Sequence, residues 1–322
     1  MKKIKSVDIL INEDLKELEI SLNESLSSEV SLATEISNYM ISSGGKRIRP
    51  LISILIARSL GYSGNKLIDL ATAIELLHTA TLIHDDVVDN SKIRRGKPSV
   101  NKKWDIMHSV LVGDFVYSKA FQKMSLLKNP DIINILANST NKISEGEVMQ
   151  LALKKTFLSE KDYFKVIGRK TAELFKAAAI SAAVLSNATL VQQNLIKELA
   201  FSLGIIFQIN DDLLDYFGDS LITGKQPGQD LLEGKVTLPL IKAFKLSGKE
   251  NQRIIKLSLK KLNEEKFSII KKIIQDSGAL EETIRIRDNY TAIFQKNISL
   301  LPKNNFRDYL KETGNEIIEI NF

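Results

Sequence analysis

Three aspartates lie within an apolar, helix-like run at residues 82–90, LIHDDVVDN. Asp85 and Asp89 are four residues apart, so an α-helix would place both carboxylates on one face, about 6 Å apart along the axis. Asp86 lies beside the first of them. Unpaired charge is very costly in a dry core, so this cluster must face water, contact cationic side chains or bind metal ions. Taken alone, the spacing is equally compatible with a solvated acidic face.

A second aspartate cluster repeats this spacing in an equally apolar stretch, QINDDLLDYFGD. It comprises Asp211, Asp212 and Asp215, with Asp219 one turn further on. Two clusters of the same spacing are hard to explain as surface charge. Neither has a histidine at metal-ligand spacing, although His84 adjoins the first, and carboxylate oxygens favour magnesium or manganese over zinc. Because protein-bound magnesium often shares its coordination sphere with substrate phosphates, the clusters predict a diphosphate ligand.

Cationic side chains occur where such a ligand would need them. Basic residues follow the first cluster, follow the second cluster and open a helix nearer the N-terminus: Arg94, Arg95 and Lys97; Lys225 and Lys235; Lys46, Arg47 and Arg49. The last group lies in GGKRIRP, where the free backbone amides of a helix start also favour anions. Arginine forks suit bidentate contacts to phosphate oxygens. The alternative interpretation of each cation is that it only balances a nearby aspartate.

The pattern of apolar residues predicts an all-α protein. Such residues recur at three- and four-residue intervals through most of the chain, and sustained two-residue alternation is hard to find. Ser159 followed by Asp162 resembles a capping box, and Asn129 before Pro130 resembles an N-cap with proline at the first helical position. No Gly/Ser linker or low-complexity tract marks a domain boundary, so we expect one helical domain over residues 1–322.

Composition excludes several classes of protein. Hydrophobic residues make up 43% and charged residues 26% of the 322 residues, as in folded globular proteins. The lack of cysteine excludes disulfides and thiolate zinc sites, and makes a cytoplasmic location the default. We expect neither a signal peptide nor a transmembrane segment, because the apolar runs are shorter than about 18 residues. The net charge of +6 is spread along the chain, so a nucleic-acid partner is not expected.

These motifs resemble those of the trans-prenyl diphosphate synthases, in the order usual for that family. The resemblance rests on GGKRIRP, LLHTATLIHDDVVDNSKIRRGKPSVN, LVGDF, GEVMQL, KTAELFKAAA, QINDDLLDYFGD and GKQPGQDLLEGKVTLPL. It extends over a core at 40–245. It implies an all-α prenyltransferase fold with helices around a deep central cavity, working as a homodimer. Within the family, the chain resembles most the bacterial long-chain enzymes that make quinone side chains, and we expect octaprenyl diphosphate as its product.

The resemblance also implies a role for each motif residue. Two or three Mg²⁺ ions, with Mn²⁺ as a substitute, would be bound by Asp85, Asp89, Asp211 and Asp215. Isopentenyl diphosphate would be held by Lys46, Arg49, His78 and Arg95. The allylic diphosphate would be held by Arg94, Lys170, Thr171, Gln208, Lys225 and Lys235, and Thr171 and Gln208 could offer oxygen dipoles to an allylic cation. The residues expected to act in catalysis are Asp85, Asp89, Asp211, Lys170, Thr171 and Gln208.

Further predictions concern the three histidines and the helix before the first cluster. His78 lies seven residues before Asp85 on nearly the same helix face, and with the motif match this favours substrate contact over a packed core position. His84 and His108 are interpreted as structural. Ala80 and Thr81 are small residues one to two turns before Asp85, where short-chain members of the family resemble one another in carrying bulky side chains. We therefore expect a chain-length pocket for a long product, with geranylgeranyl, heptaprenyl or solanesyl diphosphate as the alternatives to octaprenyl diphosphate.

Two rival functions remain open at this stage. A class I terpene cyclase would also be α-helical and would also ionise an allylic diphosphate, but it normally carries an Asn/Ser/Glu-type second metal motif where this chain has DDLLD. A non-enzymatic helical scaffold is disfavoured as a repeat protein, since no period of about 20 to 50 residues is visible. The expected partners are the two diphosphate substrates and a second copy of the chain. A second, non-identical subunit and a transient membrane contact for product release are left open.

Overall fold

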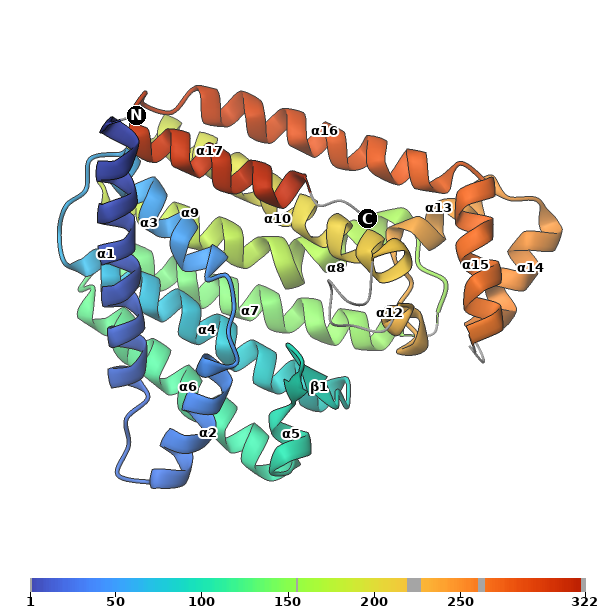
Figure 1. Ribbon diagram of the computed structural model, residues 1–322, viewed down its shortest axis with the longest axis horizontal. Coiled ribbons are helices and arrows are strands. Elements are labelled where there is room, and N and C mark those ends of the chain that lie inside the picture. The colour runs from blue at the N-terminus through green and yellow to red at the C-terminus, as the bar shows by residue number, and fades with distance from the viewer. Residues whose placement is uncertain (1, 155, 219–226, 260–263, 320–322) are drawn as a thin grey trace. The chain divides into compact units, whose positions relative to one another are not determined.

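Helices make up most of the described part of the chain (Figure 1). The structure is a computed structural model, and it describes residues 2–154, 156–218, 227–259 and 264–319. Within these ranges the β-structure is one short hairpin, in which β1 (Ile93–Arg94) pairs antiparallel with β2 (Lys97–Pro98). The predicted all-α fold is confirmed. Asp219 and Lys225, two residues singled out in the sequence, lie outside the described residues.

The chain divides by its internal contacts into two compact units. The first comprises Met1–Thr140, Leu174–Lys197 and Ile298–Glu312. The second comprises Asn141–Glu173, Glu198–Asn297 and Thr313–Phe322. The expectation of one domain over residues 1–322 stays a prediction.

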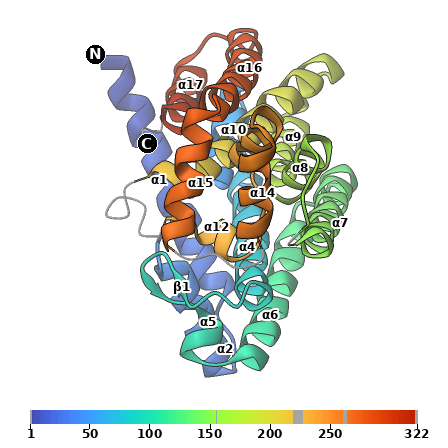
Figure 2. The ribbon, with the colours of Figure 1, turned by 90° about the vertical axis from the view of Figure 1, so that its right-hand side faces the viewer.

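Helix α4 (Lys66–Val88) is the central element of the first unit. It packs along α6 (Ile106–Leu126) and against α3 (Ile48–Ser59) and α1 (Lys2–Ser25), and Figure 2 shows α6 running beside it. Its residues from Leu70 to Leu77 are all buried, as expected for a helix that is apolar on every side. The remaining elements that lie in this unit wholly or mostly are α2 (Ser31–Ser42), the β1–β2 hairpin, α5 (Val100–Lys103), α9 (Glu173–Leu185) and α17 (Asn305–Ile318).

Helix α4 also has the length and composition of a possible membrane span. Among the described helices, only α4 is long and apolar enough to cross a membrane by length and composition. However, 67% of its most apolar window is buried inside the structure. Such burial is typical of a core helix, and it is explained by the contacts of α4 with α1, α3 and α6.

The second unit has its own apolar core. Tyr163, Ile209, Leu213 and Tyr216 belong to this core, together with Leu240 and residues further along the chain. The helices that contribute to the unit are α7 (Pro130–Leu153), α8 (Glu160–Ile167), α10 (Leu190–Phe217), α12 (Gln229–Leu232), α13 (Leu238–Leu246), α14 (Lys249–Ser258), α15 (Glu264–Asp276), α16 (Ala279–Ser299) and α17 (Asn305–Ile318). A π-helical segment, η1 (Gly168–Ala172), connects α8 to α9. Ile209, Leu213 and Tyr216 of α10 therefore lie in a packed core directly beside the second aspartate cluster.

Both predicted helix starts are confirmed. The Ser159 hydroxyl accepts a hydrogen bond from the Asp162 amide at 3.1 Å and donates to the Asp162 carboxylate at 2.6 Å, which caps α8. The Asn129 side chain accepts from the amides of Asp131 and Ile132, and α7 begins at Pro130. Local sequence alone fixes these ends, because the capping groups lie within three residues of the amides that they satisfy.

Candidate active site

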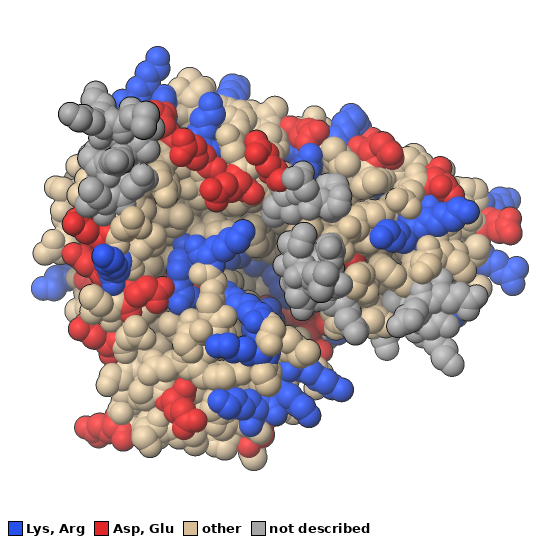
Figure 3. Space-filling model, in the orientation of Figure 1, with Lys and Arg blue, Asp and Glu red and all other residues tan. Residues whose placement is uncertain are grey.

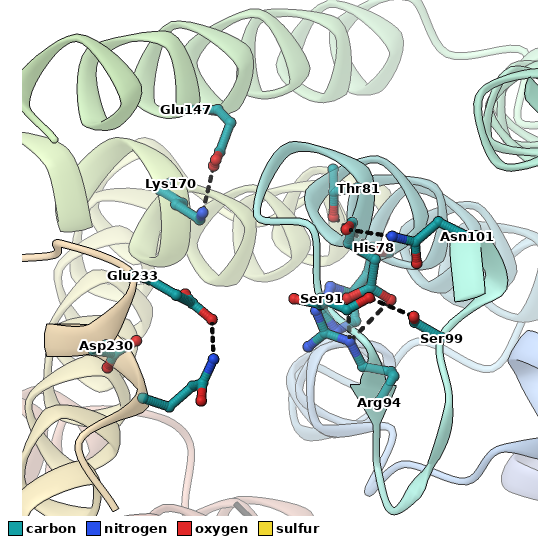
Figure 4. A network of polar contacts seen from close by, with 12 residues as sticks. His78, Thr81, Ser91, Arg94, Ser99, Asn101, Glu147, Lys170, Asp230 and Glu233 are labelled. Atoms are coloured by element: carbon teal, nitrogen blue, oxygen red, sulfur yellow. Dashed lines mark hydrogen bonds and ion pairs between the residues drawn. The ribbon is translucent and has the colours of Figure 1, made fainter. Parts of the chain in front are cut away.

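The three aspartates of the first cluster have different surroundings at the C-terminal end of α4. Asp85 and Asp89 are half-buried, whereas Asp86 is completely buried. Arg94 of β1 donates to Asp86, with Nη2–Oδ1 at 2.5 Å and Nε–Oδ1 at 3.0 Å (Figure 4). Burial raises the pKa of Asp86, and the Arg94 pair opposes that rise. The middle aspartate therefore anchors the hairpin, and the outer two are the more accessible carboxylates.

The turn after this cluster is fixed through the backbone of the same aspartate. The carbonyl oxygen of Asp86 accepts from the Ser91 amide at 2.9 Å and from the Asn101 side chain at 3.0 Å. The Ser99 hydroxyl in turn donates to the Ser91 carbonyl at 2.5 Å. Figure 3 shows lysine and arginine side chains gathered over this hairpin and α5, and the exposed ones are Lys92, Arg95, Lys97, Lys102 and Lys103. The role predicted for Arg94, binding of the allylic diphosphate, stays a prediction.

A basic cluster of Arg49, His78 and Arg95 lies in the same unit. Nη1 of Arg49 is 3.1 Å from Nε2 of His78. A Cβ atom on Gly45 would lie 2.7 Å from Nη1 of Arg95, so the Arg95 guanidinium lies directly against the backbone of the GGKRIRP turn. That turn needs glycine, because Gly44 and Gly45 have φ angles of +86° and +146°. Three of the four residues predicted to hold isopentenyl diphosphate are thus assembled, and the fourth, Lys46, is exposed on the turn.

Burial and mutual repulsion determine the electrostatics of the basic cluster. Burial lowers the pKa of Arg49 to about 10, and the charge of Arg95 acts in the same direction. The pKa of His78 is lowered well below its usual value by burial and by the neighbouring arginines. Since Arg49 can only donate, the neutral His78 accepts at Nε2 and carries its proton on Nδ1. Two guanidinium groups held close together have the charge and the forked geometry that bind phosphate oxygens in proteins.

Arg47 and Glu75 form the internal part of this region, and sequence reasoning assigned no role to Glu75. Nη1 of Arg47 is 2.9 Å from Oε1 of Glu75, and its Nε is 2.8 Å from Oε1 of Glu19 on α1. Glu75 is only 2% exposed, and burial raises its pKa while Arg47, Arg49 and Arg95 oppose the rise. For Arg47 the alternative interpretation, charge balance, is therefore the one that the contacts support. The available signal was a single glutamate inside the apolar run AIELLH.

The second aspartate cluster lies near the C-terminal end of α10. Asp211 is half-buried, while Asp215 and Asp212 are buried. Asp212 accepts from the Tyr163 hydroxyl at 2.6 Å and from the Gln208 side-chain amide at 2.9 Å. Burial raises the pKa of Asp212 to about 7, and the charge of Asp230 adds to the rise. As in the first cluster, side-chain donors hold the middle aspartate.

Lys170 and Thr171 lie on the π-helical segment η1, a feature that often marks functional sites. A Cβ atom on Gly146 would lie 2.9 Å from the Lys170 amide nitrogen, so α7 can approach this segment only because residue 146 is glycine. The Lys170 ammonium donates to Gln150 at 2.8 Å and also pairs with Glu147 (Figure 4). The Thr171 hydroxyl donates to Oε1 of Gln208 at 2.7 Å. Three residues predicted to contact the allylic diphosphate are thus positioned by α7, η1 and α10.

The segment after the second cluster is described in part. Lys235 is 2.7 Å from Glu233, and its backbone amide donates to the Asp230 carbonyl at 2.8 Å. The Asp230 amide in turn contacts Oδ2 of Asp215 at 3.3 Å, which links this segment to the end of α10. Lys225, the other lysine predicted here, lies outside the described residues.

The two remaining histidines make contacts that support the structural interpretation. His84 stacks on Tyr117 of α6 with ring centroids 5.9 Å apart, and a Cβ on Gly113 would clash with its ring. Nδ1 of His108 is 2.8 Å from Oδ2 of Asp105, whose other oxygen caps α6.

The donor set fits magnesium or manganese rather than zinc or iron. The outer aspartates of each cluster are spaced so that both carboxylates lie on one helix face, and all of their donor atoms are oxygens. Among the described residues, no three Asp, Glu, His or Cys side chains are arranged to hold a metal ion by themselves. A metal bound by one such pair would take its other ligands from water and substrate phosphates, as magnesium commonly does.

The arrangement of Arg49 and His78 predicts a histidine that does not titrate near neutrality. In ¹H–¹⁵N spectra of the three histidines, assigned with the His78→Gln variant, His78 should stay neutral with its proton on Nδ1 from about pH 5.5 to about pH 8. The reason is that protonation would place a third positive charge beside two arginines. The His78→Gln variant, whose spectrum should lack this signal, is the control. A His78 signal that titrates near its ordinary pKa of about 6.5 would contradict the basic cluster.

Known proteins share both the sequence and the fold. The polyprenyl synthetase family model matches residues 30–277. The chain is 41% identical over 261 residues to octaprenyl diphosphate synthase of Escherichia coli K12, covering 81% of each protein. It is 37% identical over 307 residues to the geranyl-diphosphate-specific all-trans-nonaprenyl-diphosphate synthase of Rhodobacter capsulatus, covering 94% of each.

A solved structure extends the comparison to nearly the whole fold. The polyprenyl synthase of Caulobacter crescentus CB15, crystallised with calcium and isoprenyl diphosphate, matches with a TM-score of 0.93 and 34% sequence identity. The match covers 99% of this chain and 98% of that one. The motifs, the helices that carry them and these relatives lead to one conclusion: the chain belongs to the polyprenyl synthetase family, and it is a prenyltransferase of the trans-prenyl diphosphate synthase type.

Proposed function

We propose that the chain extends an allylic diphosphate such as farnesyl diphosphate with successive isopentenyl diphosphate units, and that octaprenyl diphosphate is the product. The basic cluster of Arg49, His78 and Arg95 carries this proposal, because it offers a fixed anion site within the same unit as the first aspartate cluster. A terpene cyclase, which takes a single allylic diphosphate, has no use for a second diphosphate site. The identity to an octaprenyl diphosphate synthase supports the chain length proposed here.

The chemistry needs no nucleophilic side chain. The C–O bond of the allylic diphosphate breaks, the isopentenyl double bond attacks the resulting carbon, and a proton is lost to the departing diphosphate. Bound magnesium would neutralise charge on the leaving diphosphate, with Asp85, Asp89, Asp211 and Asp215 as its protein ligands. Arg94, Lys170, Lys225 and Lys235 are proposed to bind the same group. Thr171 and Gln208 are proposed to direct oxygen atoms at the allylic carbon as positive charge develops there.

The proposed chain-length pocket concerns two positions on α4. Ala80 is completely buried, and Thr81 is half-buried with its hydroxyl donating to the His78 carbonyl at 2.7 Å. Both lie before Asp85, on the side from which a tail bound by its diphosphate would extend. Neither side chain fills much volume, which supports a long product.

The family resemblance further supports a homodimer, and α6 is the surface that we propose for it. Six large apolar residues of this helix are exposed: Ile106, Met107, Val110, Leu111, Phe121 and Leu126. Met107, Val110, Leu111 and Phe121 lie within one helix face by their spacing. An apolar stripe of this extent is uncommon on a surface that contacts only water. We propose that a second copy of the chain covers it.

The transferase activity is tested directly with purified protein, magnesium, farnesyl diphosphate and labelled isopentenyl diphosphate, followed by chromatography of the dephosphorylated products. Label should enter a series of polyprenyl products, and a metal chelator should abolish incorporation. Asp85→Asn should reduce the rate at least 100-fold, as expected for loss of a residue that acts on the leaving group. Asp131→Asn, a change of an exposed aspartate in the first turn of α7, is the matched control. Cyclic products without label would favour the terpene cyclase. The absence of any turnover by the wild type would favour the non-enzymatic helical scaffold.

Chain length is tested at Thr81. Thr81→Phe should shorten the main product by at least about one isoprene unit, because one helical turn of about 5.4 Å corresponds to roughly one unit of tail. Thr81→Val keeps the volume and should keep the product length. Ala80→Phe is the less informative variant, since overpacking a fully buried site costs about 1–3 kcal/mol of stability. An unchanged product distribution in Thr81→Phe would exclude this position from the pocket.

The dimer is tested by light scattering after size exclusion. Leu111→Glu should convert a dimer of the wild type into monomers, because it places a charge in an apolar interface. Leu190→Glu, at an equally exposed leucine on α10, should leave the dimer intact. A monomeric but active wild type would refute the proposal, and an inactive monomer would direct attention to a second, non-identical subunit.

A further inference from the structure

The second aspartate of the DDLLD motif is placed differently from its neighbours. Asp212 is 1% exposed, and both of its carboxylate oxygens are engaged by protein donors. Oδ1 accepts from Nε2 of Gln208 at 2.9 Å, and Oδ2 accepts from the Tyr163 hydroxyl at 2.6 Å and more weakly from the Leu238 amide at 3.4 Å. Asp212 is therefore occupied as an internal acceptor.

This arrangement fixes which way the Gln208 amide points. Tyr163 and the Leu238 amide donate to Oδ2 of Asp212, and the ionised carboxylate accepts at Oδ1 from the NH₂ group of Gln208, which therefore faces it. Oε1 of Gln208 then faces Thr171, whose hydroxyl donates to it at 2.7 Å. The reverse orientation would set an amide oxygen against a carboxylate oxygen and is excluded by repulsion.

The orientation of Gln208 decides the orientation of Thr171 in turn. Once the Thr171 proton is given to Gln208, the hydroxyl presents only lone pairs in its other directions. Thr171 lies on η1, where the π-helical turn sets its backbone position. Four groups thus form one directed series: Tyr163 and Gln208 both donate to Asp212, and Thr171 donates to Gln208.

We infer that Tyr163 and Asp212 are positioning residues, which direct the oxygen lone pairs of Thr171 toward the allylic carbon through Gln208. This inference rests on the proposed function, in which Thr171 and Gln208 face the developing positive charge. A hydroxyl that presented its proton instead would repel that charge. The benefit appears only as the C–O bond breaks, so it acts on the rate of the chemical step and not on substrate binding.

The first aspartate motif supports treating Asp212 in this way. Its second aspartate, Asp86, is likewise completely buried and is held by side-chain donors, here from Arg94. In both motifs the outer aspartates are the proposed metal ligands, and the inner one organises its own unit. The two inner aspartates differ in what they organise, a hairpin in one case and a hydrogen-bond series in the other.

A double-mutant cycle between Tyr163 and Thr171 tests the inference, with the single-turnover rate of the first condensation as the readout. Tyr163→Phe should lower this rate about tenfold, with the KM for isopentenyl diphosphate changed less than about twofold, because one hydrogen bond acting in the transition state is lost. In the Thr171→Val background, Tyr163→Phe should have almost no further effect. In the Thr171→Ser background, which keeps the hydroxyl, the loss of about tenfold should return. Tyr290→Phe is the control, since that ring packs on Phe164 next to Tyr163 in the chain.

Each alternative outcome is distinct. Equal losses of rate from Tyr163→Phe in the wild-type and Thr171→Val backgrounds would mean that Tyr163 has only a structural role, and an unchanged rate in Tyr163→Phe would refute the inference. If the wild type makes no product, the proposed function fails. The hydrogen-bond series is then tested by measuring Tm for the same single and double variants of Tyr163 and Thr171. Independent effects on Tm at Tyr163 and Thr171 would refute the series itself, while coupled effects would support it.

Discussion

A carboxylate buried in a helical core is stable only if donors saturate it, and the inner aspartates of the two motifs meet this requirement in different ways. Asp86 takes a guanidinium from a hairpin that begins a few residues later in the chain. Asp212 takes a phenol from α8 and an amide from its own helix. In the first unit these hydrogen bonds join α4 to β1, which carries Arg94. In the second unit they join α10 to α8, which leads into the segment η1 that carries Lys170 and Thr171. Asp85, Asp89 and Asp211 are half-buried, so each motif keeps at least one carboxylate that is more accessible than its inner aspartate.

The basic cluster differs from the two aspartate motifs, because it holds side chains of like charge close together. Arg49 and Arg95 are brought together although they repel each other, and Glu75 compensates only part of their charge. A frame of glycines with positive φ angles and a neutral histidine holds them in place. Like charges held together in this way favour an anionic group over a neutral one, which is consistent with the diphosphate site proposed above.

Two glycines, which have no reactive side chain, also determine the geometry of the candidate site. Gly146 allows α7 to approach the π-helical segment, and the Lys170 and Thr171 side chains depend on that segment for their direction. Gly113 of α6 likewise leaves room for the ring of His84, which precedes Asp85 on α4. A methyl group at Gly146 would displace Lys170, and one at Gly113 would displace His84. No sequence pattern links either glycine to the residue that it would displace.

The sequence alone determined the helical class, the helix starts at Asn129 and Ser159, and the two aspartate motifs, because these depend on periodicity and on contacts within one turn. It also identified Arg49, His78 and Arg95 through the family resemblance, and the structure assembles them. Only the tertiary structure decided that Arg47 is a structural cation, that Glu75 lies beneath the basic cluster and that Tyr163 reaches Asp212. These pairings join residues that are 28 to 49 positions apart, and the choice of partner follows from how helices pack and not from local spacing. The chemistry of a charged side chain can therefore be predicted from its type and spacing, while its partner is set by which helix faces it.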